Sequence, residues 1–314
     1  MNLSLKIRSF LISTVFLIPI FVGAMFLNDL WKKEVKLNRK IINPNAKILI
    51  LGDSHTTNGI DPKVLNKAIN FSDYGESYIQ DYYKLKYALN KNNSIKTVIL
   101  PVDLHSLNNH RNNDILFIGY WDKYIDFIKL GKFRRKFIQY MIYKYIDIDL
   151  FDFRGEYFSL LKALKKKGSN RRHSYINQFK GVTDKYFHHN RDKKGERRAL
   201  HHFLGNMWID NEMISFFKKI LDLCLERKLS LVLIKMPVSI QYYGYAGRMV
   251  PIKKYYGKVK NLINGYSNVH LLDYHDIFFN KERWKFYDSE HLNADGAKIF
   301  TSILKKDLER IGDY

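Results

Sequence analysis

The chain has 314 residues, of which 46% are hydrophobic and 27% charged, a balance that excludes an intrinsically disordered protein. Its 17 glycines and 6 prolines exclude collagen-like and low-complexity classes, and no internal repeat indicates a solenoid or a propeller. The formal net charge of +22 favours an anionic partner such as a lipid headgroup, an acidic glycan or a nucleic acid, although a general enrichment in Lys, Asn, Ile and Tyr also accounts for it.

The amino terminus contains an uncharged apolar segment, residues 10–27, which follows Lys6 and Arg8 in a short tail, residues 1–9. The segment is just long enough to span the hydrocarbon core of a bilayer. It predicts a transmembrane anchor or an uncleaved signal, since Val22-Gly23-Ala24 offers only a weak cleavage site. A buried core helix is the remaining alternative.

A polar linker, residues 28–45, separates this segment from the main domain, residues 46–314. The linker carries more basic residues than the tail, so a literal positive-inside count places the domain in the cytoplasm. Long domains, however, translocate largely regardless of flanking charge. We therefore expect a single-pass, membrane-anchored protein with an extracytoplasmic domain and no nucleic acid partner.

Short apolar runs alternate with helix-like segments in the first part of the domain. The predicted strands are residues 47–51, 68–71 and 97–102, and the predicted helices are residues 61–67 and 78–90. Such alternation indicates a parallel sheet with right-handed crossovers, in which ligands bind beyond the carboxyl ends of the strands. Ser54, Gly75 and Asp103 each follow such an end.

The same pattern resumes in the last part of the domain, so the sequence predicts an α/β fold with at least five strands. Cys224, the single cysteine, lies in an apolar-periodic run and is expected to be buried in a helix. The remaining predicted strands are residues 230–236 and 269–272, and the remaining predicted helices are residues 210–227, 252–265 and 295–311.

A basic and aromatic segment, residues 108–203, separates the two parts. Its helix-like stretches, residues 121–145 and 157–167, predict a helical insertion that covers the edge of the active site. The aromatic side chains of this insertion either pack on the sheet or form a lid that binds a membrane surface or a glycan.

Two short motifs carry chemistry. Gly52-Asp53-Ser54 lies where a strand gives way to a helix, which places a hydroxyl beside backbone N–H groups that can stabilise an oxyanion. Near the carboxyl terminus, Asp288-Ser289-Glu290-His291 supplies a histidine base and a carboxylate to orient it. Each motif alone is compatible with a capped loop or helix, but the pair predicts Ser54 as nucleophile, His291 as general base and Asp288 as its partner.

These motifs, in this order, resemble those of the SGNH/GDSL hydrolase superfamily. The resemblance covers residues 47–107 and 231–308 and leaves the insertion unexplained. It implies a flavodoxin-like three-layer α/β/α domain with a parallel sheet and the triad Ser54, His291 and Asp288. It also implies an oxyanion hole formed by the N–H groups of Ser54 and Gly75.

The third motif departs from the family. The family commonly has Gly-x-Asn-Asp after the third strand and uses the Asn amide as a further oxyanion donor, whereas this chain has Pro101-Val102-Asp103. An ionised carboxylate cannot donate a hydrogen bond, so Asp103 serves only if it is protonated, and Asn108 is the alternative donor. His55, where the family has Leu, is a second departure without an evident role.

The anchored topology is also similar to that of the teichoic acid D-alanine transfer protein and the alginate O-acetyltransferases. That similarity implies an esterase or acyltransferase of cell-envelope polysaccharide, with a membrane-bound O-acyltransferase as possible partner and a glycan or a small acylated ester as substrate. Arg111 and Arg248 are candidate residues for binding an anionic polymer. No cofactor and no metal are expected.

Two other classes of function stay open. The missing Asn motivates a catalytically inactive scaffolding subunit of an envelope modification system. Alternatively, Asp53, His55, Asp288 and His291 could surround a divalent cation and form a metal-assisted hydrolase, in which Ser54 would be idle.

Overall fold

The computed structural model describes residues 42–109, 176–183, 191–205, 208–279 and 283–312. The predicted anchor, residues 28–41 of the predicted linker, both predicted helices of the insertion, and Arg111 lie outside these residues. All described residues belong to one compact unit. Within the described ranges, no helix combines the length and the apolar character that crossing a bilayer requires.

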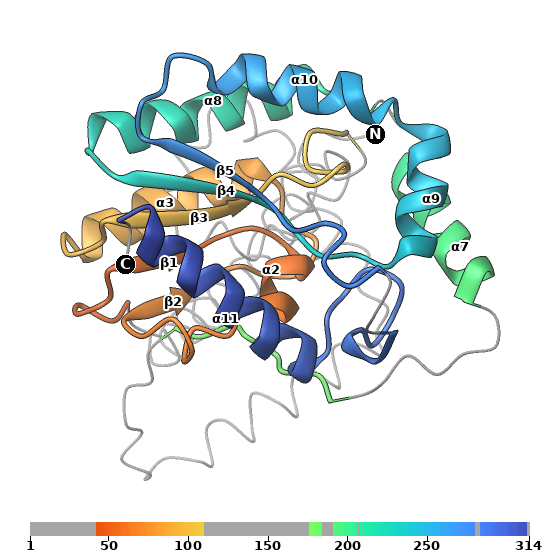
Figure 1. The fold of residues 1–314 in the computed structure, drawn as a ribbon. Helices are drawn as coiled ribbons and strands as arrows, with labels where there is room; N and C mark the ends of the chain where they lie inside the picture. The colour runs from red at the N-terminus through yellow and green to blue at the C-terminus, as the bar shows by residue number, and fades with distance from the viewer. Residues whose placement is uncertain (1–41, 110–175, 184–190, 206–207, 280–282, 313–314) are drawn as a thin grey trace, which may run out of the picture. The chain divides into compact units, whose positions relative to one another are not determined.

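The core of the described unit is a parallel sheet of five strands in the order β2-β1-β3-β4-β5. Figure 1 shows helices on both faces of this sheet. This is the strand order of flavodoxin-like doubly wound folds, and it places β1, which leads into Ser54, between β2 and β3. The strands are β1 (Ile48–Ile50), β2 (Ala68–Asn70), β3 (Thr97–Pro101), β4 (Ser230–Lys235) and β5 (Val269–Asp273).

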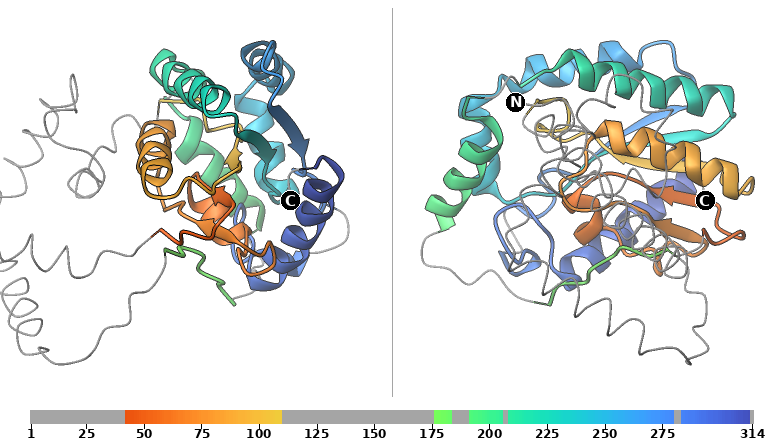
Figure 2. Two further views of the ribbon diagram at one scale, coloured as in Figure 1. Left: turned by 90° about the vertical axis from the view of Figure 1, so that its left-hand side faces the viewer. Right: turned by 180° about the vertical axis from the view of Figure 1, so that it is seen from behind.

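Both faces of the central strands are apolar, because each is covered by helices. Leu49 and Leu51 face one hydrophobic cluster, whereas Ile48 and Ile50 face the other, as the two-residue period of a strand requires. The first cluster includes buried residues of α3 (Tyr78–Lys91), α8 (Asn211–Glu226), α9 (Ile240–Met249) and α10 (Ile252–Ile263). The second cluster includes the buried face of α11 (Ala294–Arg310), which Figure 2 shows on the opposite side of the sheet.

Most predicted elements form at the expected place, and polar side chains cap the starts of two of the helices. Asp210 accepts hydrogen bonds from two backbone N–H groups at the start of α8, and Asn293 does the same for one at the start of α11. Cys224 is buried in α8, and burial raises the pKa of its thiol to about 12. The sequence pattern did not predict α9 or α7 (Arg191–Phe203) as separate helices.

One predicted helix, residues 61–67, is absent. Asp61 accepts a hydrogen bond from the N–H of Lys63, and the chain continues as a series of turns. Asn66 and Lys67 have positive φ angles of 47° and 48°, which a right-handed helix cannot contain. A short helix instead begins earlier, α2 (Ser54–Gly59), and it starts at the predicted nucleophile.

Gly52 makes the sharp turn from β1 into α2. Its φ angle is +110°, and a Cβ atom at this position would collide with the ring of Pro101. The turn brings the start of α2 next to the end of β3, so this glycine fixes where Ser54 lies.

We expect Gly52→Ala to lower the free energy of unfolding by roughly 2–4 kcal/mol, because the substitution adds both backbone strain and overpacking. Urea denaturation of the full chain in detergent measures the change. Gly257→Ala in α10 is the matched control, since no atom lies within 4 Å of the added Cβ, and it should stabilise the protein by about 0.5–1 kcal/mol. An unfolding free energy of Gly52→Ala equal to that of the wild type would contradict the strain assigned to this turn.

Candidate active site

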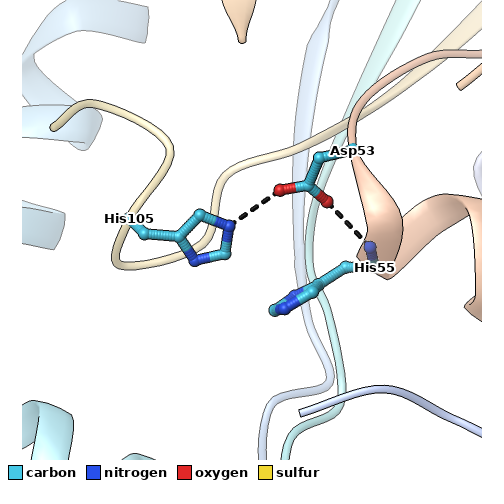
Figure 3. Close-up of side chains that lie close together, drawn as sticks. All are labelled: Asp53, His55 and His105. Carbon is cyan, nitrogen blue, oxygen red and sulfur yellow. Dashed lines mark hydrogen bonds and ion pairs between the residues drawn. The ribbon is translucent and has the colours of Figure 1, made fainter. Parts of the chain in front are cut away.

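Ser54 is the first residue of α2, directly beyond the carboxyl end of β1. Asp53 caps this helix, since its Oδ1 accepts a hydrogen bond of 2.8 Å from the N–H of His55. Its other oxygen, Oδ2, lies 2.7 Å from Nε2 of His105, in the loop after β3 (Figure 3). One buried carboxylate therefore joins the helix of the predicted nucleophile to the neighbouring strand end.

Ser54, His291 and Asp288 form a continuous chain of hydrogen bonds. Nε2 of His291 lies 2.7 Å from Oγ of Ser54, and Nδ1 lies 2.7 Å from Oδ2 of Asp288. Oδ1 of Asp288 accepts from the N–H groups of Glu290 and His291, which holds the loop closed around the carboxylate. Burial acts to raise the pKa of Asp288, but the hydrogen bond and the charge of His291 outweigh it and keep the pKa below its ordinary value.

The two predicted oxyanion donors, the N–H groups of Ser54 and Gly75, follow β1 and β2. The N–H of Ser54 lies in the first turn of α2, where a helix provides no internal acceptor. Gly75 lies in the turn after β2 with a φ angle of 71°, which glycine adopts without strain. Lys84 of α3 steadies this turn, because its Nζ contacts the carbonyl of Phe71 at 2.5 Å and Oε2 of Glu76 at 2.6 Å.

The two candidates for a third oxyanion donor are both engaged elsewhere. Oδ2 of Asp103 lies 2.8 Å from Nδ1 of His55, and Oδ1 accepts from the N–H of Met236 at 2.8 Å. The side-chain amide of Asn108 donates to the carbonyl of His202 at 2.9 Å. The geometry therefore favours neither Asp103 nor Asn108 as the donor that the family takes from Asn.

His55, which had no evident role in the sequence, lies at the centre of the buried polar groups. Burial acts to lower its pKa, but the charges of Asp53 and Asp103 outweigh burial and raise the pKa well above its ordinary value. Its ring packs edge-on against the rings of His291 and His105, with centroids 5.2 Å and 4.8 Å apart. A histidine that favours its protonated form thus follows the predicted nucleophile directly and contacts the histidine of the predicted triad.

Glu290 is a further buried carboxylate that the sequence did not single out for a role. Its Oε2 lies 3.6 Å from Nε2 of His55 and 3.6 Å from Nδ1 of His202, and Arg198 forms an ion pair with Oε1. Burial acts to raise its pKa, but the charges of His202 and other nearby histidines hold the pKa well below the ordinary value. Glu290 therefore connects the triad loop with α7, at the end of the predicted insertion.

The sequence did not reveal His105, Arg198 or His202 as site residues, because segments far apart in the chain bring them to the site. For His105, the sequence offered one indication: it lies two positions after Asp103, just beyond the end of a predicted strand. His202 and Arg198 lie on a helix whose place beside the site no local pattern gives. Arg248, a predicted substrate-binding residue, is exposed on α9 with its guanidinium over the ring of Tyr245 at 4.7 Å.

Within the described ranges, two groups of three side chains are close enough to hold a divalent cation, each with its polar atoms within 4.8 Å of one another. The first group is Asp53, His55 and His105, and the second is His55, Glu290 and His291. In the second group, Nε2 of His291 is hydrogen-bonded to Ser54 and cannot at once bind a cation and accept the serine proton. The geometry at His291 therefore favours proton transfer.

No protein-family model matches the sequence, and no curated protein matches it either. Among solved structures, the chain is similar to a provisionally named platelet activating factor from Streptococcus pneumonia, with 13% identity, 92% of this chain and 99% of that chain covered, and a TM-score of 0.41. It is also similar to a provisionally named acylhydrolase from Bacteroides fragilis, with 10% identity, 89% of this chain and 94% of that chain covered, and a TM-score of 0.41. A third similar structure is a GDSL-like lipase from Bacteroides thetaiotaomicron, with 8% identity, 90% of this chain and 96% of that chain covered, and a TM-score of 0.42. The chemistry of the site is therefore inferred from its own residues.

The raised pKa of His55 predicts a pH-dependent stability. The folded protein keeps a proton that the unfolded chain releases above pH about 6.5, so this contribution is complete below that pH and is lost as pH rises through the folded pKa. We expect the free energy of unfolding to fall by about 1.4 kcal/mol per pH unit from this group above pH about 6.5. Urea denaturation of the full chain across this range should show a slope that His55→Gln removes. His275→Gln, at an ion pair with the exposed Asp273, should keep the slope. The same pH dependence in wild type and His55→Gln would refute the assignment.

Proposed function

We propose that this chain is a serine-dependent O-acyl esterase or acyltransferase that acts on cell-envelope polysaccharide or a related polymer. The observation that carries the proposal is the hydrogen-bonded series from Ser54 through His291 to Asp288. An intact series of this kind supports catalysis over an inactive scaffold, because a scaffold has no need of an aligned base.

The geometry fits a two-step acyl transfer. In the first step His291 accepts the proton of Ser54 as Oγ attacks the ester carbonyl, and the oxyanion that forms lies against the N–H groups of Ser54 and Gly75. The carbon–oxygen bond to the leaving alcohol then breaks, and His291 returns the proton to that alcohol. In the second step water or a glycan hydroxyl attacks the carbonyl of acyl-Ser54 and loses its proton to His291. The bond between the acyl carbon and Oγ then breaks, and His291 returns the proton to Oγ.

Asp288 orients the base and stays ionised throughout. Its hydrogen bond fixes the proton of His291 on Nδ1, so Nε2 faces Ser54 as an acceptor. Because the site is buried, the charge of Asp288 also stabilises the imidazolium that forms during each step.

The envelope context rests on the sequence. Residues 10–27 would anchor the chain by a single membrane span, with the α/β domain outside the cytoplasm, and the basic insertion would face an anionic polymer. A membrane-bound O-acyltransferase would supply the acyl group in the transferase version of this function.

We expect a fluorophosphonate probe to label Ser54 in the full chain purified in detergent. The adduct, located by mass spectrometry, should be absent in Ser54→Ala, and its rate should fall on the order of a thousandfold or more in His291→Ala and Asp288→Asn, which lose the base or its correct tautomer. Ser302→Ala is the matched control, because that hydroxyl is exposed on α11 and bonds to its own helix.

A folded wild-type sample without an adduct would overturn the proposal. Labelling that a chelator abolishes would instead favour the metal-assisted class, since the serine mechanism requires no cation.

A further inference from the structure

Arg198 of α7 lies next to the triad at the boundary between the buried site and solvent. Its side chain is 38% exposed, whereas Glu290, with which it forms an ion pair through Nε, is fully buried. The same Glu290 oxygen, Oε1, lies 3.8 Å from Nε2 of His291. A single carboxylate oxygen therefore separates this guanidinium from the base that activates Ser54.

The contact with Glu290 leaves most donors of Arg198 available. A guanidinium has five N–H groups in a fixed plane, and Glu290 occupies the one on Nε. Within the described part of the chain, the two terminal amino groups form no hydrogen bond. They present the fork that binds a carboxylate or a phosphate through two parallel hydrogen bonds.

The position of Arg198 is fixed by the packing of α7 against α9. At Gly195 the two helices approach so closely that a Cβ atom would contact the backbone of Gln241 at 2.9 Å. One turn beyond Arg198, Nδ1 of His202 lies 2.7 Å from the hydroxyl of Tyr242. A guanidinium held by its helix and by Glu290 loses little further conformational entropy when it binds an anion.

We propose that Arg198 is the anion-binding residue of this active site, and that the substrate carries a carboxylate or phosphate group close to the ester that Ser54 attacks. This inference rests on the proposed function, and it names the class of substrate. It also differs from the sequence prediction, which assigned anion binding to Arg111 and Arg248. Lys193, Lys194 and Arg197 are exposed on the same helix and favour the approach of an anionic substrate.

A purely structural role for Arg198 makes a different prediction. If the residue served only to neutralise Glu290, its loss would slow reactions with charged and neutral reagents equally, because the triad itself would be disturbed. Charge selectivity at Ser54 is therefore the quantity to measure.

The test uses three fluorophosphonates with the same reactive group and spacer, which ends in a carboxylate, a phosphate or a neutral methyl ester. In each reaction Oγ of Ser54 forms a bond to phosphorus, fluoride leaves, and His291 takes the serine proton. The rate of Ser54 adduct formation is measured by mass spectrometry on the full chain in detergent.

In the wild type, we expect at least one anionic reagent to react about tenfold or more faster than the methyl ester, because hydrogen bonds between charged groups are stronger than those to a neutral ester. Arg198→Gln should abolish this preference, so that the ratio of each anionic rate to the methyl ester rate falls to about one. Arg198→Lys should keep part of the preference, because it retains the charge without the fork. Arg310→Gln, at the exposed end of α11, is the matched control and should behave as the wild type. The faster anionic reagent identifies the group.

Several outcomes would overturn the inference while the proposed function stands: no preference in the wild type, a preference that survives Arg198→Gln, or equal slowing of all three reagents in that variant. An absence of Ser54 adduct with every reagent is distinguishable from these. It would overturn the proposed function and, with it, this inference.

Discussion

The site depends on the pairing of buried carboxylates with nitrogen bases. Asp53, Asp103 and Glu290 lie in the interior beyond the ends of the strands, where an unpaired charge would cost several kcal/mol. Each carboxylate has an imidazole or a guanidinium within reach, and each pair joins two different segments. The triad is thus one part of a larger set of ion pairs, and its alignment depends on the others.

These pairs fix the positions of the residues that we propose to be catalytic. Asp53 ties the start of α2 to the loop after β3, whereas Glu290 ties the triad loop to α7. The strands contribute only by bringing the segments of the site together, since the parallel sheet places the carboxyl ends of β1, β2 and β3 at one edge. The carboxylate pairs then determine the distances over which a proton can pass from Ser54 to His291.

The sequence predicted what short-range patterns determine. Apolar runs followed by glycine or polar residues gave the strands, and the two motifs named the residues that the structure brings together as Ser54, His291 and Asp288. The helix predicted after Asp61-Pro62 was wrong, because a good start signal cannot reveal the positive φ angles that end it. The sequence did not predict a role for Arg198 or Glu290, because their contact depends on how α7 packs, and no local pattern specifies that packing.

Asp103 and His55, the two departures from the family motifs, interact with each other in the structure. A carboxylate that faced the oxyanion would oppose it, but both oxygens of Asp103 accept hydrogen bonds from His55 and Met236. His55 keeps its proton largely because Asp53 and Asp103 are there, and the resulting cation lies against His291. The two departures at Asp103 and His55 therefore belong together, because the carboxylate that cannot donate a hydrogen bond instead pairs with the histidine that follows Ser54.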